Sequence, residues 1–162
     1  QKKLIPQIKM FLTDCDGCLT DGGMYYSENG DELKRFNTLD GMGFKMLKEQ
    51  GIITGIITGE DRRLNQCRAE KMQVDVIKMG VTDKMAAVFS LCKEYGIDLA
   101  NVAYVGDDIN DLEVVKMVGF GCSVRNGNSE VKNNSKYITA LTGGHGAVRE
   151  VIDLILKNND IC

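Results

Sequence analysis

The chain has 162 residues, of which 43% are hydrophobic and 27% charged, the balance of an ordinary water-soluble globular protein. This length is enough for about one domain, so we expect a single domain over residues 1–162. The 20 basic and 23 acidic residues give a net charge of −3, which argues against nucleic acid as a partner. No apolar run is long enough to span a membrane and no signal-peptide pattern opens the sequence, so we expect a cytoplasmic protein without a membrane partner.

Short apolar runs rich in β-branched residues alternate with helical patterns along the chain. One helix is expected after Asp83 as its cap, with Gly96 ending it, and another carries an apolar face in the C-terminal tail. Alternation of this kind predicts a doubly wound α/β fold with a mostly parallel sheet and helices on both faces. The expected strands are Ile8–Thr13, Ile52–Thr58, Val74–Ile77, Val102–Gly106 and Gly119–Val124, and the expected apolar helix face is Val148, Val151, Ile152 and Ile155.

Residues 22–37 interrupt this alternation directly after the first strand. Asn29-Gly30 is a strong turn signal between two short apolar segments, so we predict an inserted β-hairpin. Its aromatic residues, expected to be exposed, favour an oligomerisation or lid element over a simple surface excursion; they are Tyr25, Tyr26 and Phe36.

Clusters of carboxylates follow two of the predicted strands. Asp14 and Asp16 come after the first strand, and Asp107, Asp108 and Asp111 come after the fourth. In a parallel sheet both clusters lie at the same edge, where two like charges about 4 Å apart repel by about 4 kcal/mol at an effective dielectric of about 20. Hard oxygen ligands of this kind favour Mg²⁺. The alternative is that Asp107 and Asp111 only cap the following helix, which would explain one cluster but not two.

Two further features suit a bound phosphate. Thr58-Gly59 ends the second predicted strand with a hydroxyl and free backbone amides. Lys84 opens the helix after Asp83, where its charge is unfavourable for the helix dipole unless it faces negative charge. Carboxylates, metal, hydroxyl and lysine around one pocket are the components of a phosphoryl-transfer site.

The chain contains six cysteines, which we interpret as buried apolar residues in a reducing compartment. Cys15 and Cys18 form a Cys-x-x-Cys pair, but no second pair has zinc-ligand spacing and the single histidine, His145, is remote in sequence. We therefore expect neither redox nor zinc chemistry there. The cysteines are Cys15, Cys18, Cys67, Cys92, Cys122 and Cys162.

These motifs, in this order and spacing, resemble those of the haloacid dehalogenase superfamily of aspartate-nucleophile phosphatases. They are Asp14-x-Asp16-Gly17-x-x-Thr20-Asp21, Thr58-Gly59, Lys84 and Gly106-Asp107-Asp108-x-x-Asp111. The early hairpin, the segment 34–37 and the motif at 143–150 resemble a narrower group. Its members are the small capless phosphatases that act on 2-keto-3-deoxy sugar-acid phosphates.

The resemblance implies a role for each matched acid. Asp14 would be the nucleophile that forms an aspartyl-phosphate and would also bind Mg²⁺. Asp16 would protonate the leaving sugar oxygen and then activate water, with its backbone carbonyl on the metal. Asp107 would complete the protein ligands of Mg²⁺, with Asp108 and Asp111 behind it.

The same resemblance places Thr58, Gly59 and Lys84 around the phosphoryl group, with Lys84 neutralising charge in the transition state. It also implies a homotetramer without a cap domain, in which the hairpins assemble and neighbouring subunits cover each other's sites.

The substrate branch depends on the residues around these motifs. Glu60, with Lys71 eleven residues later, resembles enzymes for nine-carbon acids, such as 2-keto-3-deoxynononate or N-acetylneuraminate 9-phosphates, whereas the eight-carbon branch carries arginine at the Glu60 position. Thr38 is placed in the same substrate site, in a run that lacks another arginine of the eight-carbon enzymes. We therefore expect a nine-carbon substrate, with 3-deoxy-D-manno-octulosonate 8-phosphate as the alternative. His145 replaces an arginine common in the late glycine motif.

Two other classes of protein share part of this pattern. A response-regulator receiver has its phosphoacceptor on the third strand, whereas here the acidic pair follows the first. A noncatalytic oligomerisation module, related to those fused to acylneuraminate cytidylyltransferases, remains an alternative, although every catalytic position is filled here.

Overall fold

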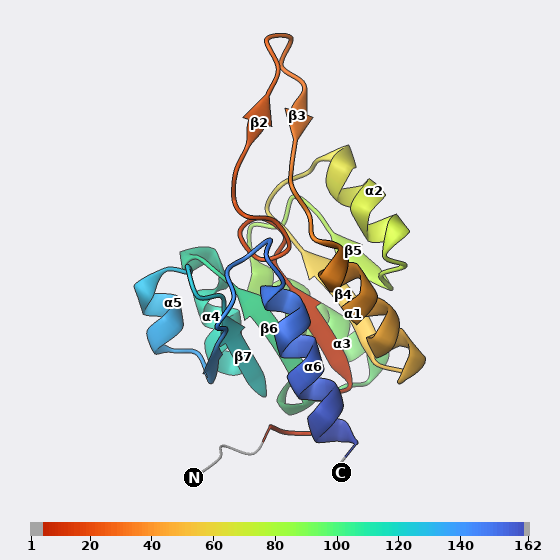
Figure 1. Ribbon diagram of the computed structural model, residues 1–162. Helices are drawn as coiled ribbons and strands as arrows, with labels where there is room; N and C mark the ends of the chain where they lie inside the picture. Colours follow the sequence, from red (N-terminus) through yellow and green to blue (C-terminus); the bar gives the residue numbers. More distant parts are fainter. Residues whose placement is uncertain (1–4, 161–162) are drawn as a thin grey trace.

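The computed structural model describes residues 5–160, and at its centre is a parallel sheet. Its strand order is β5-β4-β1-β6-β7-β8, so the chain begins at the middle of the sheet and builds outward in both directions (Figure 1). The carboxyl ends of β1, β4 and β6 therefore lie side by side at one edge. The strands are β1 (Met10–Thr13), β4 (Ile53–Ile57), β5 (Val76–Lys78), β6 (Val102–Gly106), β7 (Phe120–Ser123) and β8 (Tyr137–Ile138).

Helices cover both faces of this sheet. One apolar cluster joins the sheet to α1 (Thr38–Glu49), α2 (Arg63–Lys71) and α6 (Ala147–Asn159). The other joins it to α3 (Lys84–Tyr95), α4 (Leu112–Met117) and α5 (Ser129–Asn133). Two short 3₁₀ turns, η1 (Leu99–Asn101) and η2 (Ile109–Asp111), flank β6. This arrangement confirms the predicted doubly wound α/β fold.

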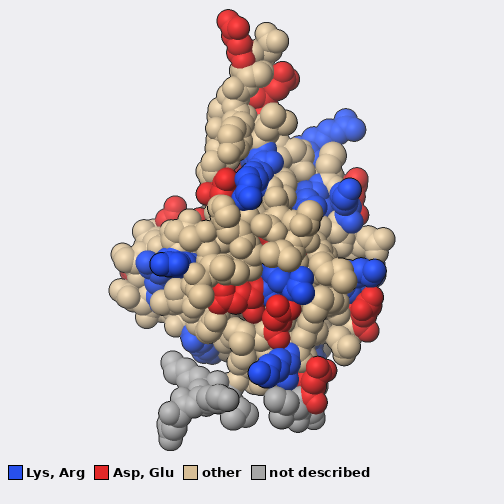
Figure 2. All heavy atoms as spheres, in the orientation of Figure 1, with Lys and Arg blue, Asp and Glu red and all other residues tan. Residues whose placement is uncertain are grey.

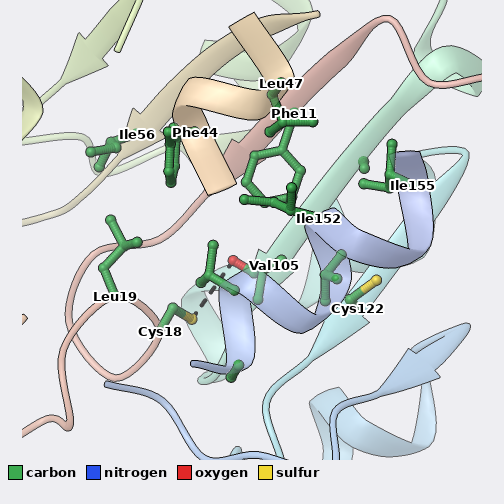
Figure 3. Packing of buried hydrophobic residues seen from close by; sticks show 14 of the residues in the cluster. Phe11, Cys18, Leu19, Phe44, Leu47, Ile56, Val105, Cys122, Ile152 and Ile155 are labelled. Atoms are coloured by element: carbon green, nitrogen blue, oxygen red, sulfur yellow. Dashed lines mark hydrogen bonds between the residues drawn. The ribbon is translucent and has the colours of Figure 1, made fainter. Parts of the chain in front are cut away.

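The core on the α1–α6 side shows why these segments form their elements. Phe11 of β1 meets Phe44 of α1 edge to face, with ring centroids 5.7 Å apart. The apolar face predicted for the tail helix is fully buried beside them, as Figure 3 shows for Ile152 and Ile155. Burying each such side chain stabilises the fold by roughly 1.5–3 kcal/mol, so this apolar contact holds the C-terminal helix α6 against the sheet.

The ends of the elements agree with most sequence predictions. The Asp83 carboxylate accepts a hydrogen bond from Ala86 N at 2.9 Å, and Gly96 ends α3 with a φ of 64°. The strand predicted at Val74–Ile77 lies later than expected, at Val76–Lys78. The edge strand β8 was not predicted, because a two-residue strand leaves no periodicity in the sequence.

The predicted hairpin is present between β1 and α1. Its strands β2 (Tyr25–Tyr26) and β3 (Glu32–Leu33) are antiparallel, and Gly30 in the turn has a φ of 85°. The hairpin projects beyond the rest of the molecule (Figure 1), and the face of it seen in Figure 2 is mostly uncharged, with acidic side chains near the tip. Tyr25 and Tyr26 are exposed as predicted. The prediction for Phe36 was wrong, because its ring is half-buried beneath the Arg68 guanidinium, 5.5 Å from the ring centroid.

The cysteine predictions hold only in part. Cys15, Cys18 and Cys122 are buried, and the cysteines of the described part of the chain are free thiols. Cys67 is exposed on α2, contrary to the prediction, and Cys162 lies outside the described residues. The prediction of no cap domain is confirmed for residues 5–160, where the hairpin is the insertion after β1. Over the same residues, no helix combines the length and apolar character needed to cross a membrane.

Candidate active site

A cavity of about 410 Å³ opens at the carboxyl edge of the sheet. It lies where β1, β4 and β6 end, which is the position at which open α/β sheets bind ligands. Most of the predicted site residues therefore meet in one place, although they are far apart in the sequence. The lining residues are Asp14, Asp16, Gly17, Gly22, Thr58, Gly59, Glu60, Asp107, Asp108 and Asn110.

Asp14, directly after β1, is the most buried acid of this lining, with 5% of its surface exposed. Its Oδ1 accepts hydrogen bonds from Cys15 N at 2.7 Å and lies 3.0 Å from Lys84 Nζ. Burial, and next the nearby charge of Asp111, raise the pKa of Asp14 well above its usual value, and the lysine offsets this only in part. A carboxylate held by one oxygen leaves its other oxygen for a reacting group.

Lys84 and Asp111 form a buried pair behind Asp14. Lys84 Nζ donates to Asp111 Oδ1 at 2.8 Å, and the hydroxyl of Tyr104 donates to the same oxygen at 2.6 Å. Burial alone would lower the pKa of Lys84, but the charges of Asp14 and Asp111 raise it above its usual value, so the lysine stays protonated. The sequence prediction that Lys84 faces negative charge is confirmed by this contact.

Asp111 also organises the second acidic cluster. Its Oδ2 accepts hydrogen bonds from the backbone N–H groups of Asp107 at 3.0 Å and Asp108 at 3.4 Å. Asp111 therefore lies behind Asp107, where the sequence placed it. Asp108 was predicted to lie behind Asp107 too, but it lines the cavity instead. Its carboxylate accepts a hydrogen bond from Ile109 N at 2.8 Å and caps the turn that follows. The acids of this cluster therefore both cap a helical turn and converge on the site.

The carboxylates of Asp14 and Asp107 converge at the mouth of the site. Each offers an oxygen that lies within 4.8 Å of the other and of Cys18 Sγ. Burial raises the pKa of Asp107 to about 6; a hydrogen bond with Asp14 opposes this shift, and the charges of Asp111 and Asp108 add to it. Burial also raises the pKa of the Cys18 thiol, so this sulfur stays protonated and is a poor ligand. The donors available are hard oxygens, which fit Mg²⁺.

Gly17 allows the two acidic loops to approach each other. A Cβ at this position would overlap the Asp107 carboxylate, and the φ of 84° is in the left-handed region that favours glycine. The glycine of the first motif therefore serves the contact between the ends of β1 and β6.

The end of β4 contributes Thr58, Gly59 and Glu60 to the cavity lining. Thr58 is 1% exposed, and its hydroxyl oxygen accepts a hydrogen bond from Glu60 N at 3.2 Å, which shapes the turn into α2. The hydroxyl proton of Thr58 remains available to donate to an oxyanion in the cavity.

Lys84 and Asp111 lie behind this lining, and three other residues considered in the sequence analysis are not part of it either. Lys71 is the last residue of α2, at the opposite end of that helix from Glu60, and Thr38 is the exposed first residue of α1. Neither lines the cavity, so the structure does not pair Glu60 with Lys71 in one pocket. His145 is exposed and lies 3.3 Å from Arg35 Nη1 through Nε2.

Sequence reasoning missed Lys34 and Tyr104 at this site. Lys34 Nζ lies 2.8 Å from Asp16 Oδ1, although a lysine beside a hairpin strand is typical of an exposed position. Tyr104 lies within an apolar strand, where nothing in the sequence indicates that its hydroxyl reaches Asp111. The only signal for the contact between Tyr104 and Asp111 is the tyrosine hydroxyl itself, the one polar side-chain group in an otherwise apolar strand.

Comparison with known proteins agrees with this geometry. Residues 48–152 match the family model for haloacid dehalogenase-like hydrolases. The 3-deoxy-D-manno-octulosonate 8-phosphate phosphatase KdsC of Escherichia coli K12 is 38% identical over 149 residues, which are 92% of this chain and 79% of that protein. The Haemophilus influenzae enzyme of the same name is 36% identical over 157 residues, covering 97% of this chain and 87% of that protein.

Solved structures give the same result. The 3-deoxy-D-manno-octulosonate 8-phosphate phosphatase of Moraxella catarrhalis, in complex with magnesium ion, phosphate ion and KDO, has a TM-score of 0.94 and 44% identity, covering 98% of this chain and 91% of that one. The cobalt-bound enzyme of Haemophilus influenzae has a TM-score of 0.92 and 34% identity, covering 98% of this chain and 92% of that one.

The fold, the acidic site and the family match define a haloacid dehalogenase-like hydrolase. Within that superfamily the chain belongs to the capless phosphatase family that includes the 3-deoxy-D-manno-octulosonate 8-phosphate phosphatases. It is therefore a phosphatase, and the alternative of a noncatalytic module is set aside.

Proposed function

We propose that this phosphatase hydrolyses 3-deoxy-D-manno-octulosonate 8-phosphate through an aspartyl-phosphate on Asp14. The observation that carries the proposal is the position of the Asp14 carboxylate in the cavity, with Lys84 at 3.0 Å on one side and Asp16, Thr58 and Asp107 around the opening. Each of these groups can bind, attack or protonate a phosphate ester.

The reaction takes place in two steps, formation of the aspartyl-phosphate and its hydrolysis. The free oxygen of Asp14 forms a bond to phosphorus while the bond from phosphorus to the sugar oxygen breaks, and Asp16 gives that oxygen its proton. Water then attacks the phosphorus of the aspartyl-phosphate and gives a proton to Asp16. Phosphate leaves, Asp14 is again a carboxylate, and Asp16 is again an acid.

The other residues bind and orient the phosphoryl group. Thr58 and Gly59 would donate to its oxygens through a hydroxyl and a backbone N–H, and Lys84 would neutralise charge beside Asp14. Asp14, Asp107 and the backbone carbonyl of Asp16 would hold Mg²⁺, with Asp111 supporting the loop that carries Asp107. When bound, Mg²⁺ supplies positive charge that stabilises the transferring phosphoryl group.

The choice of an eight-carbon acid departs from the expectation of a nine-carbon one. That expectation depended on Glu60 and Lys71 acting together, and Lys71 is not part of the cavity lining. The relatives named above, at 34–44% identity, are 3-deoxy-D-manno-octulosonate 8-phosphate phosphatases, which supports the eight-carbon substrate. Glu60 does line the cavity and keeps a nine-carbon 9-phosphate as the second candidate.

A substrate panel tests this choice. We expect kcat/KM for the eight-carbon 8-phosphate to exceed that for 2-keto-3-deoxynononate and N-acetylneuraminate 9-phosphates by at least about tenfold, a difference that pocket contacts can supply. A nine-carbon acid with the higher kcat/KM would overturn the choice of substrate and leave the phosphatase chemistry intact.

Metal removal tests the chemistry itself. Phosphate release from p-nitrophenyl phosphate should disappear with EDTA and return with added Mg²⁺, because the facing carboxylates of Asp14 and Asp107 require a cation before phosphate can approach. Activity that persists in EDTA would contradict the proposed use of Asp14 and Asp107.

We also propose that residues 1–162 act as one phosphatase domain with the hairpin of residues 22–37 as an insertion, and that the enzyme is a homotetramer. The exposed apolar side chains of the hairpin support this assembly, since Tyr25, Tyr26 and Leu33 are 52%, 64% and 68% exposed.

A further inference from the structure

Lys34 is a buried cation at the foot of the hairpin that the steps above do not use. Its side chain is 0% exposed, and its Nζ lies 2.8 Å from Asp16 Oδ1. A buried ammonium group is strongly unfavourable unless it is paired, so this contact holds Lys34 and Asp16 together.

The surroundings hold Lys34 in one position. Its Nζ donates to Asn65 Oδ1 at 3.3 Å, and Asn65 is itself 1% exposed on α2. Glu32 of β3 lies 3.9 Å away and is bound on its other side by Arg62 at 3.1 Å. The Lys34 side chain is therefore held between the hairpin and α2 and does not extend into solvent.

The hydrogen-bonding chemistry of lysine determines what this contact does to Asp16. An ammonium group has three donors and no acceptor, so an acidic proton on Oδ1, the Asp16 oxygen 2.8 Å from Lys34 Nζ, would have nothing to donate to there. When Asp16 is an acid, its proton therefore resides on the other oxygen, Oδ2. Both oxygens are buried and neither has a hydrogen-bond partner among residues 5–160, but only Oδ1 forms an ion pair there. Oδ2 is thus the oxygen left to serve a substrate.

We propose that Lys34 is a positioning residue: it binds Asp16 Oδ1 and so directs the acidic proton on Oδ2 to the leaving oxygen of the phosphate ester. This inference builds on the proposed function, since it assumes that Asp16 is the general acid. It makes the foot of the hairpin part of the catalytic apparatus.

A comparison of two substrates tests this role. An alkyl phosphate such as 3-deoxy-D-manno-octulosonate 8-phosphate needs its leaving oxygen protonated, whereas p-nitrophenolate is a weak base that leaves without a proton. The quantity to compare is kcat/KM, which reports the steps up to aspartyl-phosphate formation. For K34M we expect a loss of about 100-fold or more on the alkyl phosphate and less than about threefold on p-nitrophenyl phosphate.

Three further variants make the result specific. K34R, which is also a donor without an acceptor, should recover most of the loss on the alkyl phosphate. D16N should show the same dependence on the substrate as K34M, and D16N/K34M should lose little more than D16N alone. If K34M does not fold by circular dichroism, K34A, which also removes the donor, takes its place in the same comparison.

R35M is the matched control, because it removes a cation from the neighbouring position. Arg35 donates to Gly144 O at 3.0 Å and does not contact Asp16 in the structure. Any loss in this variant should fall equally on both substrates.

The outcomes separate this inference from the proposed function. Equal losses of K34M on both substrates, with D16N still substrate-dependent, would overturn the role of Lys34 alone. A D16N variant whose losses do not depend on the leaving group would overturn Asp16 as general acid, and the role of Lys34 with it.

Discussion

Single residues at this site are held by contacts that also bias their chemistry. Asp14 has one oxygen bound by Cys15 N and Lys84, and burial raises its pKa. Asp111 gathers Lys84, Tyr104 and two backbone N–H groups without lining the cavity. The residues behind the acids of the cavity therefore determine which of their oxygens is free.

Asp14→Asn tests the nucleophile. The amide keeps the size of the side chain but cannot form an acyl-phosphate, so phosphate release should fall by at least about a thousandfold. The fold should be unchanged by circular dichroism, because the buried repulsion among the acids is reduced. Phosphate release near the wild-type rate would show that another residue attacks phosphorus.

Asp40, on α1, gives a prediction about pH and stability. It is 1% exposed and accepts a hydrogen bond from Arg149 N at 2.9 Å at the start of α6. Burial raises its pKa from 3.8 to about 6, although Arg149 and Arg68 oppose the shift. The folded state therefore binds a proton more readily than the unfolded state, and this group makes the protein less stable as the pH rises from about 4 to 6.

Asp40→Asn removes this titration and keeps an oxygen for Arg149 N. A shift of about 2 pKa units corresponds to about 3 kcal/mol, so the unfolding free energy of D40N relative to wild type should rise by up to that amount between pH 4 and 7. Urea denaturation of both proteins across this pH range measures the difference in unfolding free energy. Asp14 and Asp107 are present in both proteins, so their titration cancels in this difference. A difference that stays constant with pH would contradict the assignment.

At the scale of elements, the loop of residues 143–146 connects the hairpin, the loop that follows β1, and α6. Gly144 N donates to Cys18 O at 3.1 Å, and its carbonyl accepts from Arg35 at 3.0 Å and Asn37 at 3.1 Å. Cys18 in turn lies 3.7 Å from Val105 O of β6, the contact drawn in Figure 3. One glycine therefore fixes the return of the hairpin against the loop that carries Asp14 and Asp16.

Gly144→Ala tests this connection. The φ of Gly144 is 74°, and a Cβ there would overlap Asp21 N and lie 2.7 Å from Thr20 C, so we expect a loss of about 2–4 kcal/mol and a lower kcat/KM. Gly51→Ala is the matched control, since Gly51 has a φ of 71° but nothing within 4 Å of a Cβ. It should lose only about 1–2 kcal/mol and no activity. Equal losses in urea denaturation for the two variants would mean that the close approach is unimportant.

At the scale of the whole molecule, the open cavity and the projecting hairpin belong together. Residues 5–160 contain no cap that covers the cavity, and the exposed apolar surface of the hairpin is available for another subunit. In the proposed tetramer, assembly of the hairpins would shield the site from water.

Replacing Tyr25, Tyr26 and Leu33 together by serine tests the assembly without disturbing Lys34. We expect monomers of about 17.9 kDa by light scattering and a lower kcat/KM on the sugar-acid phosphate. Replacing the exposed apolar residues Phe89 and Met117 by serine, 51% and 53% exposed on α3 and α4, should leave the tetramer intact. Fully active monomers of the hairpin variant would refute the proposed role of the assembly.

The sequence by itself determined the fold class and most of the cavity lining. Periodic apolar runs show which segments are buried, and the carboxyl ends of parallel strands share one edge, so the acids after β1 and β6 could be placed at the same edge of the sheet. The apolar periodicity is a local property of the chain, whereas the pairing of β1 with β6, which brings these acids together, is a tertiary one. They also explain why the cap of α3 at Asp83 and its end at Gly96 could be predicted.

The tertiary structure alone decided which side chains outside the motifs reach the site. Lys34 is brought to Asp16 by the return path of the hairpin, while Lys71 is carried away from Glu60 along α2. Phe36 is covered by Arg68 from a helix that lies far along the sequence. Such contacts depend on how separate elements pack and on the exclusion of water between them, and no local pattern encodes either.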